Sequence, residues 1–191
     1  MLEKIIVSRT RRKIMQILFE DCNKALYLRQ IARKIKEEIN GVKRELDILT
    51  TAKVVIKEQI SNRTFFRANK DWLYFQEFLH IFFKNSKTIK LILKNQPILG
   101  KINFLVFSDK FITKTPINKT EVYLLIVGTV VLPEIVKLIS EIEKDYGREI
   151  NYTVMTKDEF EFRKKNKDPF LWNFLTEPKV VIIGKEEKLM K

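Results

Sequence analysis

The sequence predicts an α+β protein of two domains joined by an aromatic helix. Three observations predict this class. Residues 1–70 have the pattern of three helices followed by two short strands, and residues 96–191 alternate strands with helices. Residues 71–95, between them, have helical spacing and many aromatic side chains. We therefore expect domain boundaries near residues 70 and 95.

The N-terminal part begins with three short helices. Ser8 can cap a helix over residues 9–19, because its side-chain oxygen can accept from the first-turn amides. Residues 28–35 repeat apolar side chains at three- and four-residue spacing, which predicts a second helix. Asn40 is a good N-cap for a third helix over about residues 40–51.

Two β segments follow the third helix. A strand begins at Val54, residues 61–63 are turn formers, and the β-rich residues 64–67 return. The order helix, helix, helix, strand, turn, strand is that of a winged helix-turn-helix. In that fold the third helix enters the major groove of DNA.

The run from Ser8 to Ala68 also resembles the winged-helix domain of ArsR-like transcription regulators. The segments that carry the resemblance are SRTRRKIMQILFE, LRQIARKIK, NGVKRELDILTTAKVVIKEQ and SNRTFFRAN. The resemblance implies sequence-specific binding to double-stranded DNA.

Positive charge gathers at the same end of the chain. The formal net charge is +13, and residues 1–70 hold 17 Lys and Arg against 8 Asp and Glu, whereas residues 71–191 hold 20 against 16. Phosphate backbones are the commonest partner of such a field. A lysine-rich proteome bias is the alternative, but that bias enriches glutamate as well and does not favour one end.

The predicted DNA contacts lie on the second and third helices and on the hairpin. Lys43 and Arg44 can donate to guanine or phosphate, Gly41 lets the backbone approach closely, and Arg63 suits phosphates or a narrow minor groove. The full predicted set is Arg29, Gln30, Lys36, Asn40, Gly41, Lys43, Arg44, Arg63, Thr64 and Arg67.

Two observations leave alternatives open for this surface. A helix-turn-helix with a hairpin also serves as a protein-interaction module. In addition, Glu37, Glu38 and Glu45 lie close to the predicted contacts and would repel phosphates. They either restrict the docking angle or indicate a different helix register.

The aromatic segment predicts a helix over about residues 72–84, capped by Asp71. Apolar side chains cover most of its circumference, so it must be buried on several sides. It either packs between the domains or also forms a two-fold dimer interface, and we favour a homodimer with two recognition helices about one DNA turn apart. The predicted interface residues are Trp72, Phe75, Phe78, Leu79, Phe82 and Phe83.

The C-terminal part predicts a mixed sheet with helices. Strands are expected over residues 102–107, 121–127, 148–155 and 179–183. Two helices are expected between these strands. The first begins at Pro133 and ends at Gly147. The second is capped by Thr156, with Glu159 completing a capping box.

This part resembles the minimal nucleotidyltransferase domain that is fused to winged helices in archaeal regulators. EVYLLIVG, GREINYTVMTKDEF and KDPFLWNFLTEPKVVIIG carry the resemblance. Active members have Gly-Ser after the first strand and Asp-x-Asp entering the second, and the carboxylates hold two Mg²⁺. The corresponding positions here are Ser108, Asp109, Glu121, Tyr123 and Asn151, so the resemblance implies a domain without transferase activity.

Composition excludes several other classes. One cysteine allows no intramolecular disulfide, and one histidine with one cysteine cannot supply a zinc site. No apolar run reaches the roughly 20 residues that span a bilayer, and no signal peptide is visible. We therefore expect a cytoplasmic protein without metal or cofactor.

A DNA-binding transcription regulator is the leading interpretation, with a C-terminal domain for dimerisation or for docking an effector or partner. An antitoxin-like interaction protein and a recruiter of the transcription machinery are the alternatives.

Overall fold

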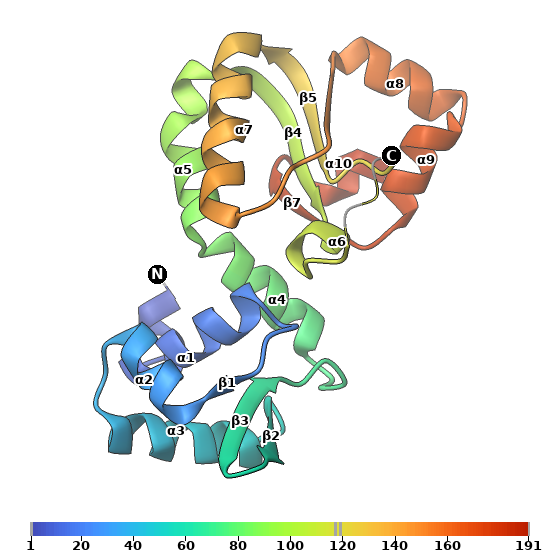
Figure 1. Cartoon of the computed structure of the whole chain (residues 1–191). Helices are drawn as coiled ribbons and strands as arrows, with labels where there is room; N and C mark the ends of the chain where they lie inside the picture. The colour runs from blue at the N-terminus through green and yellow to red at the C-terminus, as the bar shows by residue number, and fades with distance from the viewer. Residues whose placement is uncertain (1, 117, 119, 191) are drawn as a thin grey trace. The chain divides into compact units, whose positions relative to one another are not determined.

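The computed structural model describes residues 2–116, 118 and 120–190. The chain forms two compact units, Met1–Ser86 and Lys87–Lys191 (Figure 1). The boundary falls inside the expected aromatic connector, whose two helices are divided between the units. Among the described residues, no helix combines the length and apolarity needed to cross a bilayer.

The N-terminal unit is a winged helix-turn-helix. A short 3-10 turn at Leu2–Lys4 comes first. The elements that follow are α1 (Arg9–Glu20), β1 (Leu26–Tyr27), α2 (Leu28–Ile35), α3 (Ile39–Thr51), β2 (Val55–Ile60), β3 (Arg63–Ala68) and α4 (Phe75–Lys84). The strands form an antiparallel sheet in the order β1-β3-β2. The two-residue strand β1 is the one element of this sheet that the sequence pattern did not predict.

Helix α1 begins where the sequence predicts. Ser8 is its N-cap, and the Ser8 hydroxyl accepts from the backbone N–H of Arg11 at 3.2 Å. Ile14 and Leu18 are buried on the inner face of the helix. Both lie at the expected spacing, so the apolar stripe of α1 packs into the core of the unit.

Helix α3 begins one residue earlier than expected, and the prediction of Asn40 as its N-cap is wrong. Glu38 is the N-cap, and its carboxylate accepts from the backbone N–H groups of Asn40 and Gly41 at 2.8 and 3.1 Å. Lys36 ends α2 in the left-handed region with φ 54°. Only residues 36–38 separate α2 from α3, and Glu38, which directly precedes α3, caps its exposed amides.

The prediction that Asp71 caps a helix from residue 72 is also wrong. Helix α4 begins at Phe75, and the backbone N–H of Asp71 instead donates to the side chain of Asn69 in the preceding turn. The ring of Phe19 on α1 lies 5.6 Å from Phe75 and 5.3 Å from Phe82. This stack fixes α4 to α1, so the first aromatic helix belongs to the N-terminal unit.

The C-terminal unit is a mixed four-stranded sheet with helices. Its elements are α5 (Lys87–Asn95), a 3-10 turn at Gln96–Ile98, β4 (Gly100–Ser108), α6 (Asp109–Ile112), β5 (Leu124–Val130), α7 (Leu132–Tyr146), β6 (Tyr152–Met155), α8 (Lys157–Lys165), α9 (Pro169–Thr176), β7 (Lys179–Ile183) and α10 (Glu186–Met190). The strand order is β6-β5-β4-β7, and only the β5–β6 pair is parallel.

Helices lie on both sides of this sheet in Figure 1, with α5 and α7 on one side and α8 and α9 on the other. One core cluster joins Phe104 and Val106 of β4 to Phe160 of α8 and to Leu171 and Leu175 of α9. Alternate residues of the same strands point to the opposite face.

Several predicted boundaries in this unit are confirmed, but β5 begins three residues later than expected, at Leu124, and one strand is shorter than expected. Gly147 ends α7 with φ 72°, and Thr156 caps α8 by accepting from the N–H of Glu159. The strand predicted over residues 148–155 starts only at Tyr152, because the N–H of Ile150 donates to the side chain of Glu143 instead of a neighbouring strand.

Candidate nucleic-acid interface

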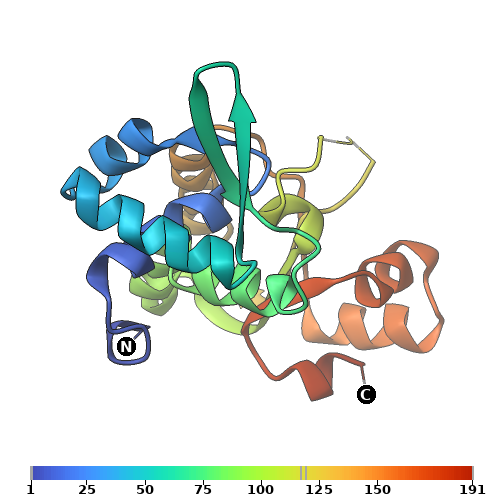
Figure 2. The ribbon, with the colours of Figure 1, turned by 90° about the horizontal axis from the view of Figure 1, so that it is seen from below.

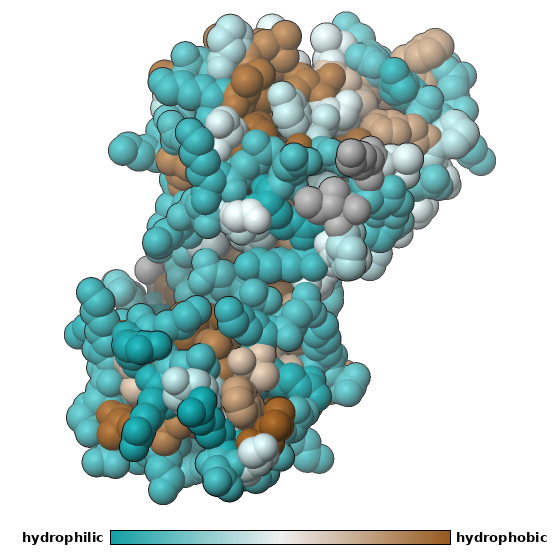
Figure 3. All heavy atoms as spheres, in the orientation of Figure 1, coloured by the Kyte–Doolittle hydropathy of each residue, from teal (hydrophilic) through white to brown (hydrophobic). Residues whose placement is uncertain are grey.

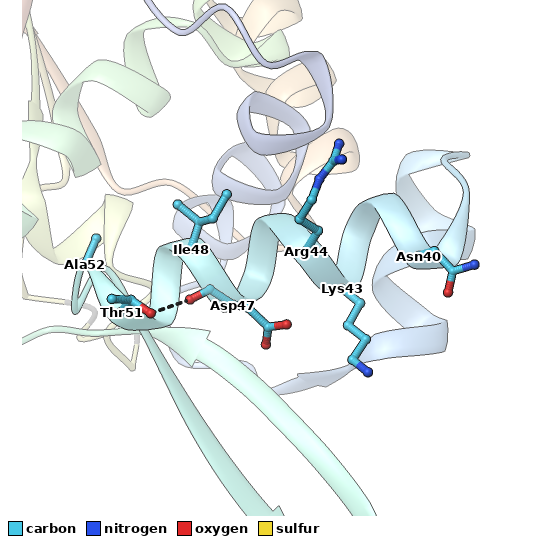
Figure 4. Close-up of a pocket in the computed structure, with 7 residues that line it drawn as sticks. All are labelled: Asn40, Lys43, Arg44, Asp47, Ile48, Thr51 and Ala52. Carbon is cyan, nitrogen blue, oxygen red and sulfur yellow. Dashed lines mark hydrogen bonds between the residues drawn. The ribbon is translucent and has the colours of Figure 1, made fainter.

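One face of α3 turns away from the core of the N-terminal unit. Val42, Leu46 and Leu49 are buried on its inner side. A shallow hollow of about 650 Å³ runs along the outer side (Figure 4). The residues that line it are Asn40, Lys43, Arg44, Asp47, Ile48, Thr51 and Ala52. Three- and four-residue spacing places them on one stripe of the helix, which is the geometry of a recognition helix.

A second hollow of about 590 Å³ lies between α3, the start of α2 and the hairpin. Four basic side chains line it: Arg29 of α2, Lys43 of α3, Lys57 of β2 and Arg63 of β3. Two helices and the two strands of the hairpin thus place positive charge around one concave surface, which suits a phosphate backbone. Lys57 was not among the predicted contacts, although its exposed position on an alternating strand could have indicated it.

The hairpin β2–β3 projects beyond the helices of the N-terminal unit (Figure 2). Ile60 pairs with Arg63 across the two-residue turn, and Ser61 in that turn has φ 51°. The guanidinium of Arg63 lies 5.2 Å above the ring centre of Tyr27. This cation–π contact orients the charge toward the second hollow rather than away from it.

Two other predicted hairpin contacts have partners within the hairpin. The Thr64 hydroxyl donates to the side chain of Gln59 at 2.7 Å. Arg67 pairs with Glu58, with 2.7 Å between Nη2 and Oε1. Their predicted DNA roles remain predictions, and the charge of Arg67 is balanced locally.

The predicted contacts on α2 lie near the helix-turn-helix turn. Arg29 and Lys36 are exposed. Gln30 is partly buried, and its side-chain oxygen accepts from the backbone N–H of Tyr27 at 3.1 Å. Gln30 thus has a capping role at the start of α2 that the sequence analysis missed.

The three glutamates near the predicted contacts all have structural roles. Glu37 pairs with Lys13 at 2.6 Å and with Arg9 at 3.1 Å, while Glu38 caps α3. Glu45 is only 6 % exposed and points into the unit. None of the three lines the hollow along α3, although Glu38 is exposed at the start of this helix.

Glu45 ties α3 to α1. Its carboxylate accepts from the Ser8 hydroxyl and from Nε of Arg11, both at 2.7 Å. Burial raises the pKa of Glu45, but the hydrogen bonds from Ser8 and Arg11 and the nearby positive charges lower it more, so the pKa lies below its ordinary value. Glu45 therefore fixes the orientation of α3 through a charged group.

We expect Glu45→Gln to lower the free energy of unfolding of the N-terminal unit by about 1–2 kcal/mol at pH 7, because hydrogen bonds to a charged acceptor are lost. Because the pKa of Glu45 is lowered in the folded state, its ionised carboxylate stabilises the fold at pH values above the ordinary pKa of glutamate, 4.5. This stabilisation is lost as the pH falls through the folded-state pKa. Urea titrations of wild type and variant should therefore converge in acid.

Glu58→Gln, which breaks the more exposed pair with Arg67, is the matched control and should cost about 0–1 kcal/mol. An equal loss from both variants, or a gap that persists in acid, would contradict this role for Glu45.

The positions that were predicted to correspond to a transferase motif lie at one end of the sheet of the C-terminal unit. Ser108 caps α6, and its backbone N–H donates to the carbonyl of Tyr123 at 2.9 Å. The N–H of Tyr123 donates to the carbonyl of Asn151 at 2.7 Å. Asp109, the first residue of α6, is 6 % exposed. Ser108, Tyr123 and Asn151 are therefore neighbours, and their correspondence to a transferase motif stays a prediction.

Their chemistry does not fit a magnesium site. Nζ of Lys110 lies 3.2 Å from Glu121 and 2.8 Å from Glu177. The hydrogen bond with Glu177 raises the pKa of Lys110 more than burial lowers it, and Glu121 adds to the rise. Tyr123 is fully buried, and its hydroxyl accepts from the N–H of Asn118. Within the described ranges, no group of three His, Cys, Asp or Glu is arranged to hold a metal ion.

Most of the predicted dimer residues contribute to the core. Phe75, Leu79, Phe82 and Phe83 are each 7 % exposed or less. Trp72 and Phe78 are half-buried, and their rings lie 4.9 Å apart. The exposed apolar side chains in and just before α4 are Leu73, Tyr74 and Ile81, which were not predicted.

Comparison with known proteins adds only distant structural similarity. No protein-family model and no curated protein sequence matches the chain. Reduced HlyU from Vibrio cholerae N16961 is similar over 45 % of this chain and 85 % of its own, with 12 % identity and a TM-score of 0.37. NadR in complex with 4-hydroxyphenylacetate is similar over 50 % of this chain and 75 % of its own, with 18 % identity and a TM-score of 0.37.

Human N-acetylserotonin methyltransferase in complex with SAM is similar over 52 % of this chain and 33 % of its own, with 14 % identity and a TM-score of 0.30. TM-scores this low do not establish a shared fold. The winged-helix description of the N-terminal unit therefore rests on its own helix order and strand pairing.

Proposed function

We propose that this chain is a transcription regulator that binds double-stranded DNA, with α3 in the major groove and the hairpin against the backbone or minor groove. The observation that carries the proposal is the positive surface shared by α2, α3 and the two strands of the hairpin. Arg29, Lys43, Lys57 and Arg63 line one hollow beside the exposed stripe of α3. A groove-sized helix and a basic hairpin side by side match the shape and the charge of a duplex.

The exposed surface of the N-terminal unit supports the same proposal. Hydrophilic side chains cover most of the face of this unit that Figure 3 shows. Glu37 and Glu45 are paired with basic side chains, and Glu38 caps α3. Among the residues that line the outer stripe of α3, two are basic, Lys43 and Arg44, and one is acidic, Asp47.

Gly41 supports the proposal independently. It lies in the first turn of α3, and glycine is a weaker helix former than alanine. A Cβ at this position would meet no atom of the chain within 4 Å. Since packing does not require glycine here, close approach of an external backbone gives it a purpose.

Salt dependence tests the proposal. We expect the affinity of the full chain for a duplex to fall with salt on a log–log plot with a slope of several units, about 0.9 for each neutralised phosphate. Lys57→Ala should reduce the slope by about 1. Affinity that does not change with salt, or no binding to any duplex, would overturn the proposal.

For the C-terminal unit we propose a dimerisation or partner-docking role without nucleotidyl transfer. The pairing of Glu121 with Lys110 and the burial of Tyr123 support this reading, because Mg²⁺ prefers charged or carbonyl oxygen ligands that are not already neutralised. We expect no transfer of label from nucleoside triphosphates in the presence of Mg²⁺. Magnesium-dependent labelling of a product would refute this proposal and leave DNA binding untouched. Light scattering tests the homodimer.

A further inference from the structure

An exposed isoleucine lies within the basic stripe of α3. Ile48 is 42 % exposed and lines the hollow along the helix together with Arg44 and Thr51. In Figure 4 the side chains of Arg44 and Ile48 project from the same side of α3, whereas Lys43 and Asp47 project from the other. Lys43 and Asp47 also line the hollow beside the hairpin, and Arg44 and Ile48 do not. The stripe thus has two edges: one with Lys43 and Asp47 beside the hairpin, and one with Arg44 and the apolar Ile48.

The fold itself does not account for Ile48. The apolar residues that attach α3 to the core are Val42, Leu46 and Leu49, on the opposite side of the helix. A β-branched residue is also a weaker helix former than the alanine, lysine or glutamate that suits an exposed position. Its side chain is therefore available to an external partner, and the charge of the surrounding stripe selects a polyanion.

A duplex offers one prominent apolar group in the major groove, the 5-methyl of thymine, and apolar side chains contact it. Four residues along a helix correspond to about 6 Å. This is close to two base-pair steps of about 3.4 Å each. A base contacted by Arg44 and a methyl contacted by Ile48 would therefore lie about two base pairs apart.

We propose that Ile48 is a specificity residue that reads a thymine methyl, about two base pairs from a base read by Arg44. The inference rests on the proposed DNA binding and adds a base preference to it. The guanidinium of Arg44 favours guanine, whose O6 and N7 accept two hydrogen bonds. The preferred site then contains a guanine and a thymine at this spacing.

Thymine-to-uracil substitution tests the proposal, because deoxyuridine keeps the base pair and removes only the 5-methyl group. The full chain is first used to select its preferred duplex, and each thymine is then replaced in turn. We expect one replacement to weaken binding about fourfold, which corresponds to about 0.8 kcal/mol for one buried methylene-sized group. With Ile48→Ala, the same replacement should leave affinity unchanged, because the contact is already absent.

Ile5→Ala is the matched control. Ile5 is an exposed isoleucine of the same unit, 75 % exposed, and it lines neither hollow. This variant should retain the fourfold effect. The proposal is overturned if no thymine is selected, if no replacement weakens binding, or if the replacement weakens wild type and Ile48→Ala equally. Wild type that selects no duplex at all overturns the proposed function itself, so the two failures are distinguishable.

Discussion

Replacing Arg44 and Arg63 together by alanine is expected to weaken duplex binding by more than about 1–3 kcal/mol, the contribution of one specific arginine–base contact, because the phosphate contact of Arg63 is lost as well. The two side chains come from different elements. Arg44 lies on the outer stripe of α3, and Arg63 lies beside the hairpin turn above the ring of Tyr27. One variant therefore removes a groove contact and a backbone contact.

The two arginines should affect specificity differently. Arg44→Ala should relax the base preference at one position, because base contacts carry sequence information. Arg63→Ala should weaken binding to all sequences to a similar degree, because phosphate contacts do not. Titrations of each variant against the preferred duplex and against a scrambled duplex separate the two effects.

The matched control for the double variant removes the same charge elsewhere. Lys24 and Arg33 are exposed residues of the same unit that line neither hollow. Changing both to alanine lowers the net charge by the same amount, so a general field effect would weaken binding equally in both double variants. If the control loses as much affinity as Arg44→Ala with Arg63→Ala, the specific contacts proposed here are not present.

Phe19→Ala is expected to lower the free energy of unfolding of the N-terminal unit by about 3–5 kcal/mol, the usual cost of removing a buried phenylalanine. Phe19 is 1 % exposed and contacts Phe75, Phe78 and Phe82, with ring centres 5.3 to 6.4 Å away. Because single domains have total stabilities of about 5–15 kcal/mol, this change removes a large fraction of the stability.

Trp72 can report this unfolding. Its ring lies 4.9 Å from Phe78, and the other tryptophan, Trp172, lies in the C-terminal unit. In a Trp172→Phe background, the tryptophan fluorescence of Phe19→Ala during a urea titration therefore reports the unfolding of the N-terminal unit alone. Ile5→Ala, at a position 75 % exposed in the N-terminal unit, is the control and should shift stability by less than about 0.5 kcal/mol. An unchanged midpoint for Phe19→Ala would show that α4 does not pack on α1.

Periodicity predicted the elements of the N-terminal unit well, because each is defined by local signals. Ser8 caps α1, and the apolar spacing of α2 and α3 matches their buried faces. The starts of α3 and α4 were misplaced, since Asn40 and Asp71 are good caps by residue type, but the turn before each helix decides which residue is available. Residue propensity cannot express that geometry.

The candidate site was predicted only in outline. Lys43, Arg44 and Arg63 lie on the predicted surface, but Lys57 joins them only because the hairpin folds back beside α3. Glu45 looked like an unfavourable charge next to phosphates until the structure placed it against Ser8 and Arg11 from α1. Such pairings join residues more than 30 positions apart, so a local pattern does not contain them.

The central claim is that α3 and the hairpin contact a duplex, and amide hydrogen exchange of the full chain with and without its selected duplex tests it most directly. We expect slower exchange on addition of the duplex at the start of α3 and in the hairpin turn, around Gly41 and Asn62, and weaker slowing for a polyanion without base edges, such as heparin at matched charge. Slowing confined to the C-terminal unit, or none in α3 and the hairpin under conditions where the duplex is bound, would contradict the account.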